Sequence, residues 1–370
     1  MTAEIVRPKR RTPLELATLV LPPVALVVLA LTFTAYDLPV LVQVVIGALL
    51  AGAVLVAVHH AEVVAHRVGE PYGSLILAVA VTVIEVGLIV MLMIGGGTGT
   101  ASLARDTVFA AVMITCNGIL GLSLLLGTLR RRVAVFKREG TAAALGTVLA
   151  IATLCLVLPT FTTTTPGPQF SPAQLAFAAV ASLALYLLFV FVQSVRHRDY
   201  FVPAEDNDVD RDDHADQPSN RATFVSLGLL LASLVAVVGL AKVEQPAIRD
   251  GVDAAGLPPS FVGVVIALLV LLPETIAAAR NARRGRVQIG INLALGSAMA
   301  SIGLTIPVIA IASIWLPGPL ELGLNSLEIV LLALTAAVGV LTVIPGRATI
   351  LQAGLHLVLC AAFLWFAAVP

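Results

Sequence analysis

Apolar segments of about 20 residues recur along the chain and are separated by short polar stretches. An α-helix needs about 20 apolar residues to cross the hydrocarbon core of a bilayer, so each segment is long enough to span it. We place eleven spans, at residues 14–35, 39–58, 74–94, 107–127, 142–160, 172–194, 222–241, 259–279, 287–314, 324–344 and 349–369. The ninth span contains Pro307, which predicts a tilt or a break in that helix.

The composition of the chain leads to the same fold class. Hydrophobic residues make up 59% of the 370 residues, charged residues make up 12%, and the mean hydropathy is +1.01. In soluble domains about a quarter of the residues are charged. One water-soluble core of this length has no room for so much apolar surface. The sequence therefore predicts an all-α integral membrane protein with about eleven transmembrane helices.

The basic residues indicate how the chain is oriented, because Lys and Arg accumulate on the cytoplasmic side of membrane proteins. With the N-terminus in the cytoplasm, all 22 basic residues fall in cytoplasmic segments except Arg105, Lys242 and Arg249. One helix more or fewer in the middle would scramble this pattern. We therefore expect a multi-pass protein of the plasma (inner) membrane with a cytoplasmic N-terminus and an extracytoplasmic C-terminus.

The chain divides into two halves around one polar linker. We expect a tail and first helix at residues 1–36, a five-helix repeat at 37–195, an acidic cytoplasmic linker at 196–221 and a second five-helix repeat at 222–370. Five helices per half make the second half enter the membrane from the opposite side, as in the inverted repeats of many transporters. The linker is either a flexible solvated loop or a collector and sensor of cations; its acidic residues are Asp199, Glu205, Asp206, Asp208, Asp210, Asp212, Asp213 and Asp216.

Each half carries a glutamate inside the second of its five predicted helices, Glu85 in the first half and Glu274 in the second. A charged side chain at the centre of a bilayer costs about 2.5–3.5 kcal/mol on insertion scales, so such a residue is a functional candidate. Neither core segment contains Lys or Arg. The partners of the two glutamates must then be protons, bound cations or polar groups of neighbouring helices. For Glu274 the alternative is a side chain that reaches toward the membrane surface and pairs with Arg280.

A carboxyl group away from water can hold a proton near neutral pH, and a hard cation held by oxygen atoms would displace that proton. Competition of this kind would couple the fluxes of the two ions. Further oxygen atoms are expected from Thr82, Asn117, Asn292, Ser297, Ser301 and the backbone carbonyl of Leu269, to which Pro273 cannot donate. The alternative is that the small polar residues only help the helices to pack.

A polar cluster at the inner end of the second helix holds His59, His60, Glu62 and His66. We interpret it as a gate or a proton-entry group; plain interfacial histidines and a bound structural metal are the alternatives. His356 lies in the last predicted helix, either as a packing residue or as part of a proton path.

The sequence resembles the cation/proton exchanger (CAX) branch of the calcium/cation antiporter superfamily, and within it the bacterial ChaA-like calcium/proton or sodium/proton antiporters. The residues that carry the resemblance are 60–73, 80–86, 272–274, 296–305 and 352–359. The resemblance implies eleven helices, inverted repeats, and a cation and proton site at Glu85 and Glu274. The wider superfamily has a Gly-Asn pair shortly before each acidic residue. This chain has Val81-Thr82 and Val270-Leu271 there, and so lacks those amide ligands.

These features predict a secondary active antiporter that exports Ca²⁺, or else Na⁺ or K⁺, in exchange for H⁺ by alternating access. The alternatives are a passive cation channel and a Na⁺(K⁺)/H⁺ antiporter without significant Ca²⁺ transport. We expect neither enzyme activity nor a cofactor. The expected partners are membrane lipids and small inorganic cations, and 22 basic against 22 acidic residues give no reason to expect nucleic acid.

Overall fold

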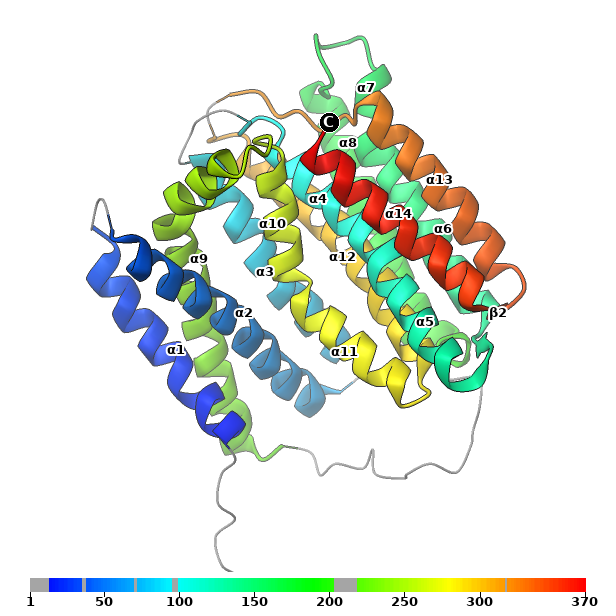
Figure 1. The fold of residues 1–370 in the computed structure, drawn as a ribbon, viewed down its shortest axis with the longest axis horizontal. Coiled ribbons are helices and arrows are strands. Elements are labelled where there is room, and N and C mark those ends of the chain that lie inside the picture. Colours follow the sequence, from blue (N-terminus) through cyan, green and yellow to red (C-terminus); the bar gives the residue numbers. More distant parts are fainter. Residues whose placement is uncertain (1–12, 35–37, 70–71, 95–98, 203–217, 317) are drawn as a thin grey trace, which may run out of the picture.

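The computed structural model describes residues 13–34, 38–69, 72–94, 99–202, 218–316 and 318–370, and these are almost entirely helical (Figure 1). The helices are α1 (Pro13–Thr32), α2 (Val40–Val68), α3 (Tyr72–Ile94), α4 (Leu103–Met113), the π-helical turn η1 (Ile114–Ile119), α5 (Leu120–Arg131), α6 (Arg138–Ala152), the π-helical turn η2 (Thr153–Val157), α7 (Leu158–Phe161), α8 (Pro172–Phe191), the π-helical turn η3 (Val192–Arg196), the 3-10 turn η4 (Arg198–Tyr200), α9 (Asn220–Ala254), α10 (Phe261–Val270), α11 (Leu272–Arg283), α12 (Val287–Ala312), α13 (Ser326–Val343) and α14 (Ile350–Ala368).

The predicted all-α membrane fold is confirmed, and the number of membrane spans is close to the predicted eleven. Within the described residues, nine helical stretches are long and apolar enough to cross a membrane. Helices α10 and α11 form a further span that is bent by 52° between Val270 and Leu272. The shorter apolar helix Leu16–Thr32, which is most of α1, is the remaining candidate for an eleventh span.

Two helices run well beyond their apolar segments. Helix α2 continues to Val68 and α9 to Ala254, whereas the predicted spans end at residues 58 and 241. A helix satisfies its backbone polar groups internally, so polar side chains near the membrane surface do not end it. The extension of α2 places His59, His60, Glu62 and His66 on a helix.

Of the tilt or break predicted at Pro307, the break is wrong, because α12 runs from Val287 to Ala312 without interruption, while the tilt stays a prediction. Helix α12 lies at the centre of the molecule and contacts α3, α4, α5, α6, α8 and α11 (Figure 1). Neighbouring helices let a membrane helix tolerate the one backbone hydrogen bond that proline removes. The chain bends instead between Val270 and Leu272, just before Pro273.

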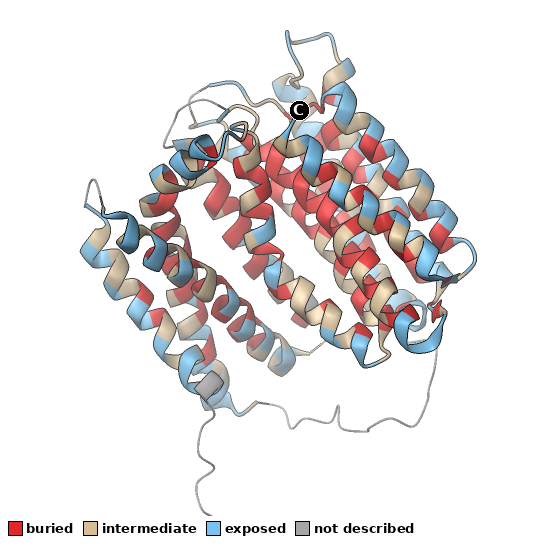
Figure 2. Ribbon diagram, in the orientation of Figure 1, coloured by how far each residue is buried: buried red, intermediate tan, exposed pale blue. Residues whose placement is uncertain are grey.

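The helices form two groups around two clusters of buried side chains. Helices α1, α2 and α9 pack on one another and, together with α3 and α10, enclose the smaller cluster. Helices α4, α5, α6, α8, α12, α13 and α14 enclose the larger one. Figure 2 shows that buried positions are densest on the central helices, whereas the outer surfaces of α1 and α2 are exposed.

The linker and the C-terminus lie on opposite faces of the molecule (Figure 1). We call the face where η3 ends and α9 begins the linker face, and the face where α14 ends the C-terminal face. A two-stranded antiparallel pair on the linker face, β1 (Ala134–Val135) with β2 (Arg347–Ala348), joins the α5–α6 turn to the α13–α14 turn. This pair was not predicted. The acidic residues Glu205, Asp206, Asp208, Asp210, Asp212, Asp213 and Asp216 lie outside the described residues, so both interpretations of the linker stay open.

Helices α10 and α4 approach each other closely at Gly263. A Cβ atom on Gly263 would stand 2.8 Å from the backbone nitrogen of Thr107 and 2.8 Å from the backbone carbonyl carbon of Asp106. These are main-chain atoms, which cannot move aside as the end of a side chain can. Glycine at this position therefore sets the distance between α10, which leads to Glu274, and α4.

We predict that Gly263→Ala destabilises the protein by about 1–3 kcal/mol, the usual cost of overpacking a core. The control is Gly146→Ala in α6, where a Cβ would meet nothing within 4 Å. Alanine favours the helical state by about 0.5–1 kcal/mol over glycine, so the control should be neutral or slightly stabilising. Thermal unfolding in detergent measures both variants, and equal behaviour of the two would contradict the close packing of α10 on α4.

The orientation predicted from the basic residues is tested with fusions after Pro370. Alkaline phosphatase, which folds only outside the cytoplasm, should be active there, and a fluorescent protein that matures only in the cytoplasm should be dark. The same reporters inserted after Val202, on the linker side, should behave in the opposite way. Fluorescence from the C-terminal fusion would show that the chain is inverted.

Candidate functional site

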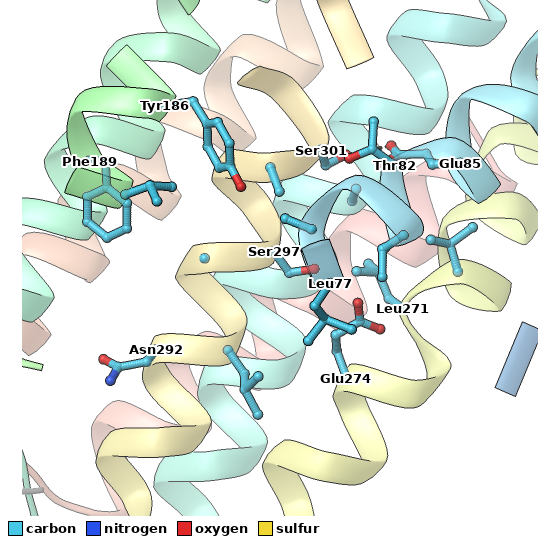
Figure 3. A pocket seen from close by; sticks show the side chains of 18 of the residues that line it. Leu77, Thr82, Glu85, Tyr186, Phe189, Leu271, Glu274, Asn292, Ser297 and Ser301 are labelled. Atoms are coloured by element: carbon cyan, nitrogen blue, oxygen red, sulfur yellow. Dashed lines mark hydrogen bonds between the residues drawn. The ribbon is translucent and has the colours of Figure 1, made fainter. Parts of the chain in front are cut away.

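Glu85 and Glu274 meet at one cavity. The cavity has a volume of about 240 Å³ and lies between α3, α8, α11 and α12. Thr82, Ser297 and Ser301 line it together with the two glutamates (Figure 3). The rest of its wall is mostly aliphatic. Two acidic side chains that are 189 residues apart in the sequence therefore share one largely apolar chamber.

Glu85 lies in the middle of α3 and is 3% exposed. The hydroxyl of Ser301 on α12 donates a hydrogen bond of 2.5 Å to its Oε1 atom. The hydroxyl of Thr305, one turn further along α12, is buried without a hydrogen-bond partner. Helix α12 thus presents two hydroxyl groups near this carboxyl group, one already bound to it.

Glu274 lies in the first turn of α11, immediately after the break. Pro273 has no N–H to continue α10, and its ring disfavours an unbroken helix. The positive end of the α11 dipole consequently lies beside the carboxyl group and favours negative charge there. The Oε2 atom of Glu274 is buried and has no hydrogen-bond partner.

No ion pair joins Glu274 to Arg280 within the described part of the chain. Arg280 interacts electrostatically with Glu62 on α2 instead, and Glu62 in turn with Glu274. Glu274 also interacts electrostatically with Glu85. The alternative interpretation of Glu274, as a side chain paired with Arg280 near the surface, is therefore wrong.

Of the predicted oxygen ligands on α3 and α12, all four line the cavity, but they differ in their bonding. The amide of Asn292 is already engaged: its Nδ2 donates to the carbonyl of Phe201 at 2.6 Å, and its Oδ1 accepts from Gln288 at 2.8 Å. Asn292 therefore ties the start of the linker to the edge of the cavity. Thr82, Ser297 and Ser301 lie nearer the carboxyl pair (Figure 3).

Leu269 does not line the cavity, although Ala267, Val270 and Leu271 do. Its side chain packs against the smaller apolar cluster formed with α1, α2 and α9. The prediction that Leu269 lines the ion path is not supported, because Ala267, Val270 and Leu271 share the helix face that borders the chamber and Leu269 lies on a different face.

Asn117 and His356 also lie away from the cavity, in a separate buried network. His356 is fully buried; its Nδ1 donates to Oδ1 of Asn117 at 3.2 Å, and its Nε2 lies 3.2 Å from the hydroxyl of Thr342. Asn117 donates to Thr335 at 2.9 Å. These contacts join the π-helical turn η1 to α13 and α14, so the bonding of Asn117 is that of a residue that holds helices together.

The histidines of α2 do not converge on one point. His60 is 3% exposed and donates from Nε2 to the backbone carbonyl of Thr18 on α1 at 2.9 Å, whereas His59 and His66 are exposed. Of this cluster, Glu62 interacts electrostatically with the carboxyl pair, through Glu274. The described residues hold no group of three or more His, Cys, Asp or Glu side chains that could bind a metal ion.

Sequence reasoning missed the contribution of α8 and η3 to the cavity wall. Tyr186, which is 4% exposed, and Gln193 both line the chamber. Gln193 is a polar residue near the end of a strongly apolar segment, and that exception was the available signal. Tyr186 gave no such signal, because a tyrosine in a membrane segment can occupy many positions that have no functional role.

Comparisons with known proteins agree with this architecture. The model of the sodium/calcium exchanger protein family matches residues 38–195 and 225–369. A putative ionic transporter y4hA of Sinorhizobium fredii is 46% identical over 326 residues, which are 87% of each chain. The sodium-potassium/proton antiporter ChaA of Escherichia coli is 33% identical over 350 residues, which are 94% of each chain.

Two solved structures share the fold. Native YfkE has a TM-score of 0.71 and 15% identity, covering 96% of this chain and 99% of its own. The H⁺/Ca²⁺ exchanger CAX has a TM-score of 0.67 and 16% identity, covering 95% of this chain and 91% of its own. These relatives are transporters and not enzymes. The extent of the family match and the identity to the Escherichia coli antiporter show that this chain belongs to the sodium/calcium exchanger protein family.

Proposed function

We propose that this protein is a secondary active antiporter that exchanges a small inorganic cation for protons, with Glu85 and Glu274 as the shared binding groups. One observation carries the proposal: two acidic side chains from opposite halves of the chain line one buried cavity, and neither forms an ion pair with a basic side chain in the described residues. Their charge must be balanced by something that enters the cavity from outside the protein.

Protons and cations compete for the pair. Two ionised carboxylates in an apolar chamber attract a cation, and the hydroxyl groups of Thr82, Ser297 and Ser301 add neutral oxygen atoms. Protonation removes both negative charges and with them most of the attraction for the cation. The site therefore carries either protons or a cation at one time. When it opens alternately to the two sides of the membrane, export of the cation is coupled to entry of protons.

The arrangement of the cavity favours access from the linker face. Leu77, Gln193 and Asn292 line it, and each lies near the linker-face end of its helix, at the start of α3, in η3 and at the start of α12. Toward the C-terminal face the chamber reaches about as far as Glu85 and Ser301. With the orientation predicted from the basic residues, this is an arrangement open toward the cytoplasm.

Calcium is our first candidate for the transported cation, because two carboxylates balance its charge and hard cations take oxygen ligands. Calcium needs about 6–8 oxygen atoms, so water must complete the shell provided by the carboxyl and hydroxyl groups. Sodium and potassium are the second candidates, because the relative with 33% identity is named a sodium-potassium/proton antiporter. Calcium carries two positive charges, and sodium and potassium carry one each, so the candidates differ in how much of the charge of the two carboxylates they balance.

We predict that Glu85→Gln and Glu274→Gln each reduce cation/proton exchange to the rate of vesicles that lack the protein. Glutamine keeps the size of the side chain but neither binds a proton nor balances a cation. The measurement is the collapse of a pH gradient in everted vesicles when the cation is added.

The matched control is Glu139→Gln, which removes an exposed carboxyl group at the linker face that pairs with Arg138. This variant should exchange at the wild-type rate. Retained exchange in Glu85→Gln or Glu274→Gln would remove that residue from the mechanism. Current without any proton gradient would identify a passive channel instead.

We expect calcium to collapse the gradient at a lower concentration than sodium or potassium when the three are compared in parallel. The physical reason is that a divalent ion balances both carboxylates at once. Collapse by sodium or potassium with no response to calcium would contradict this preference and identify a monovalent cation/proton antiporter.

A further inference from the structure

A third buried carboxyl group lies outside the cavity. Glu244 on α9 is 5% exposed, and its Oε1 atom is buried without a hydrogen-bond partner. Its Oε2 atom would stand 3.9 Å from a Cβ atom placed on Gly47 of α2. The carboxyl group therefore lies in the contact between α2 and α9, opposite a residue with no side chain.

Glu244 lies on the C-terminal side of the carboxyl pair. The next residue, Gln245, donates to the backbone carbonyl of Leu92 on α3 at 3.2 Å, and Arg249 donates to the same carbonyl at 3.1 Å. Leu92 is seven residues beyond Glu85 in the same helix, or about 10 Å along its axis. The chamber of Glu85 and Glu274 extends toward the linker face, whereas Glu244 lies between the pair and the opposite face.

No charged group near Glu244 neutralises it in the described part of the chain. Helix α1 has one titratable residue, Glu15 in its first turn, and α10 has none; α3 has Tyr72 in its first turn and Glu85. On α2 the nearest titratable groups are His59 and His60, about 18 Å along the helix from Gly47.

The charged neighbours on α9 itself are Lys242, Arg249, Asp250 and Asp253. The ammonium group of Lys242 lies 4.2 Å from the ring centroid of Phe33, and Arg249 binds the carbonyl of Leu92. Neither forms an ion pair with Glu244.

A carboxylate that is buried without a partner is costly, and such a group keeps a proton instead. A small cavity of about 30 Å³ at the C-terminal face is lined by Leu92, Arg249 and Asp253. This is enough room for a water molecule, which needs about 10–15 Å³ of such space. Arg249 is five residues after Glu244, or about 7.5 Å along the axis of α9. Water in this cavity would lie about one and a half turns of α9 from Glu244, on the side of the C-terminal face.

We propose that Glu244 is a third proton-binding group, which takes up a proton from water on the C-terminal face and returns it there. The proton binds a carboxylate oxygen to give the neutral acid, and its release restores the carboxylate. The link to transport rests on the proposed antiport, but the binding of a proton at Glu244 does not.

Infrared spectroscopy tests proton binding without any transport. The background is the Glu85→Gln/Glu274→Gln variant, which removes the two carboxyl groups of the cavity. At neutral pH this protein should show the C=O stretching band of a protonated carboxyl group, and adding Glu244→Gln should abolish that band. Glutamine resembles the neutral acid in shape, so the fold should be kept; adding Glu139→Gln instead should leave the band unchanged. A spectrum that Glu244→Gln does not alter would overturn the proposal.

Proteoliposomes test the direction of access. In the otherwise native protein, Glu244→Gln should shift or flatten the dependence of exchange on the pH at the C-terminal face and leave the dependence at the linker face unchanged. Glu244→Asp should restore the native profile at least in part. An unchanged profile at the C-terminal face would overturn the assigned route. If Glu85→Gln abolishes exchange but keeps the infrared band of Glu244, proton binding at Glu244 is supported independently of the proposed antiport.

Discussion

A negative charge away from water must be balanced, and the arrangement of this protein around Glu85 and Glu274 follows from that requirement. The protein supplies neutral hydroxyl groups from α12 and the positive end of the α11 dipole, but no basic side chain bonded to either carboxyl group in the described residues. An arginine at this point would balance the charge permanently. Hydroxyl groups and a helix dipole stabilise the carboxylates only in part, and the proposed antiport assigns the remainder to a mobile ion.

The two halves of the chain present their glutamates in different ways. Glu85 is in the middle of the continuous helix α3, whereas Glu274 is in the first turn of α11, after a bend of 52°. Only the second glutamate follows a proline. The inverted repeat therefore need not give two equivalent sites, and the dipole of α11 acts on Glu274 more directly than any helix end acts on Glu85.

Buried polar residues serve two purposes here, and the structure separates them. Ser301 faces the carboxyl pair, while Asn117 and His356 bond to each other and to α13 in a network distant from the cavity. Asn292 does both: it lines the cavity and holds the carbonyl of Phe201 at the start of the linker. A buried amide needs partners wherever it lies, so polarity within a membrane segment does not by itself indicate an ion path.

The sequence by itself determined the approximate number of spans and singled out Glu85 and Glu274 as candidate site residues. Apolar segments of about twenty residues, and a glutamate within one of them, are visible in the amino-acid sequence alone. It placed the proline breaks poorly: Pro307 lies in an unbroken helix, whereas Pro273 follows a bend. It also could not show that Tyr186 and Gln193 form the cavity wall, that Leu269 faces elsewhere, or that Glu244 is buried against Gly47. Which side chains share a chamber depends on the rotation and bending of packed helices, and these are fixed by contacts between residues far apart in the chain.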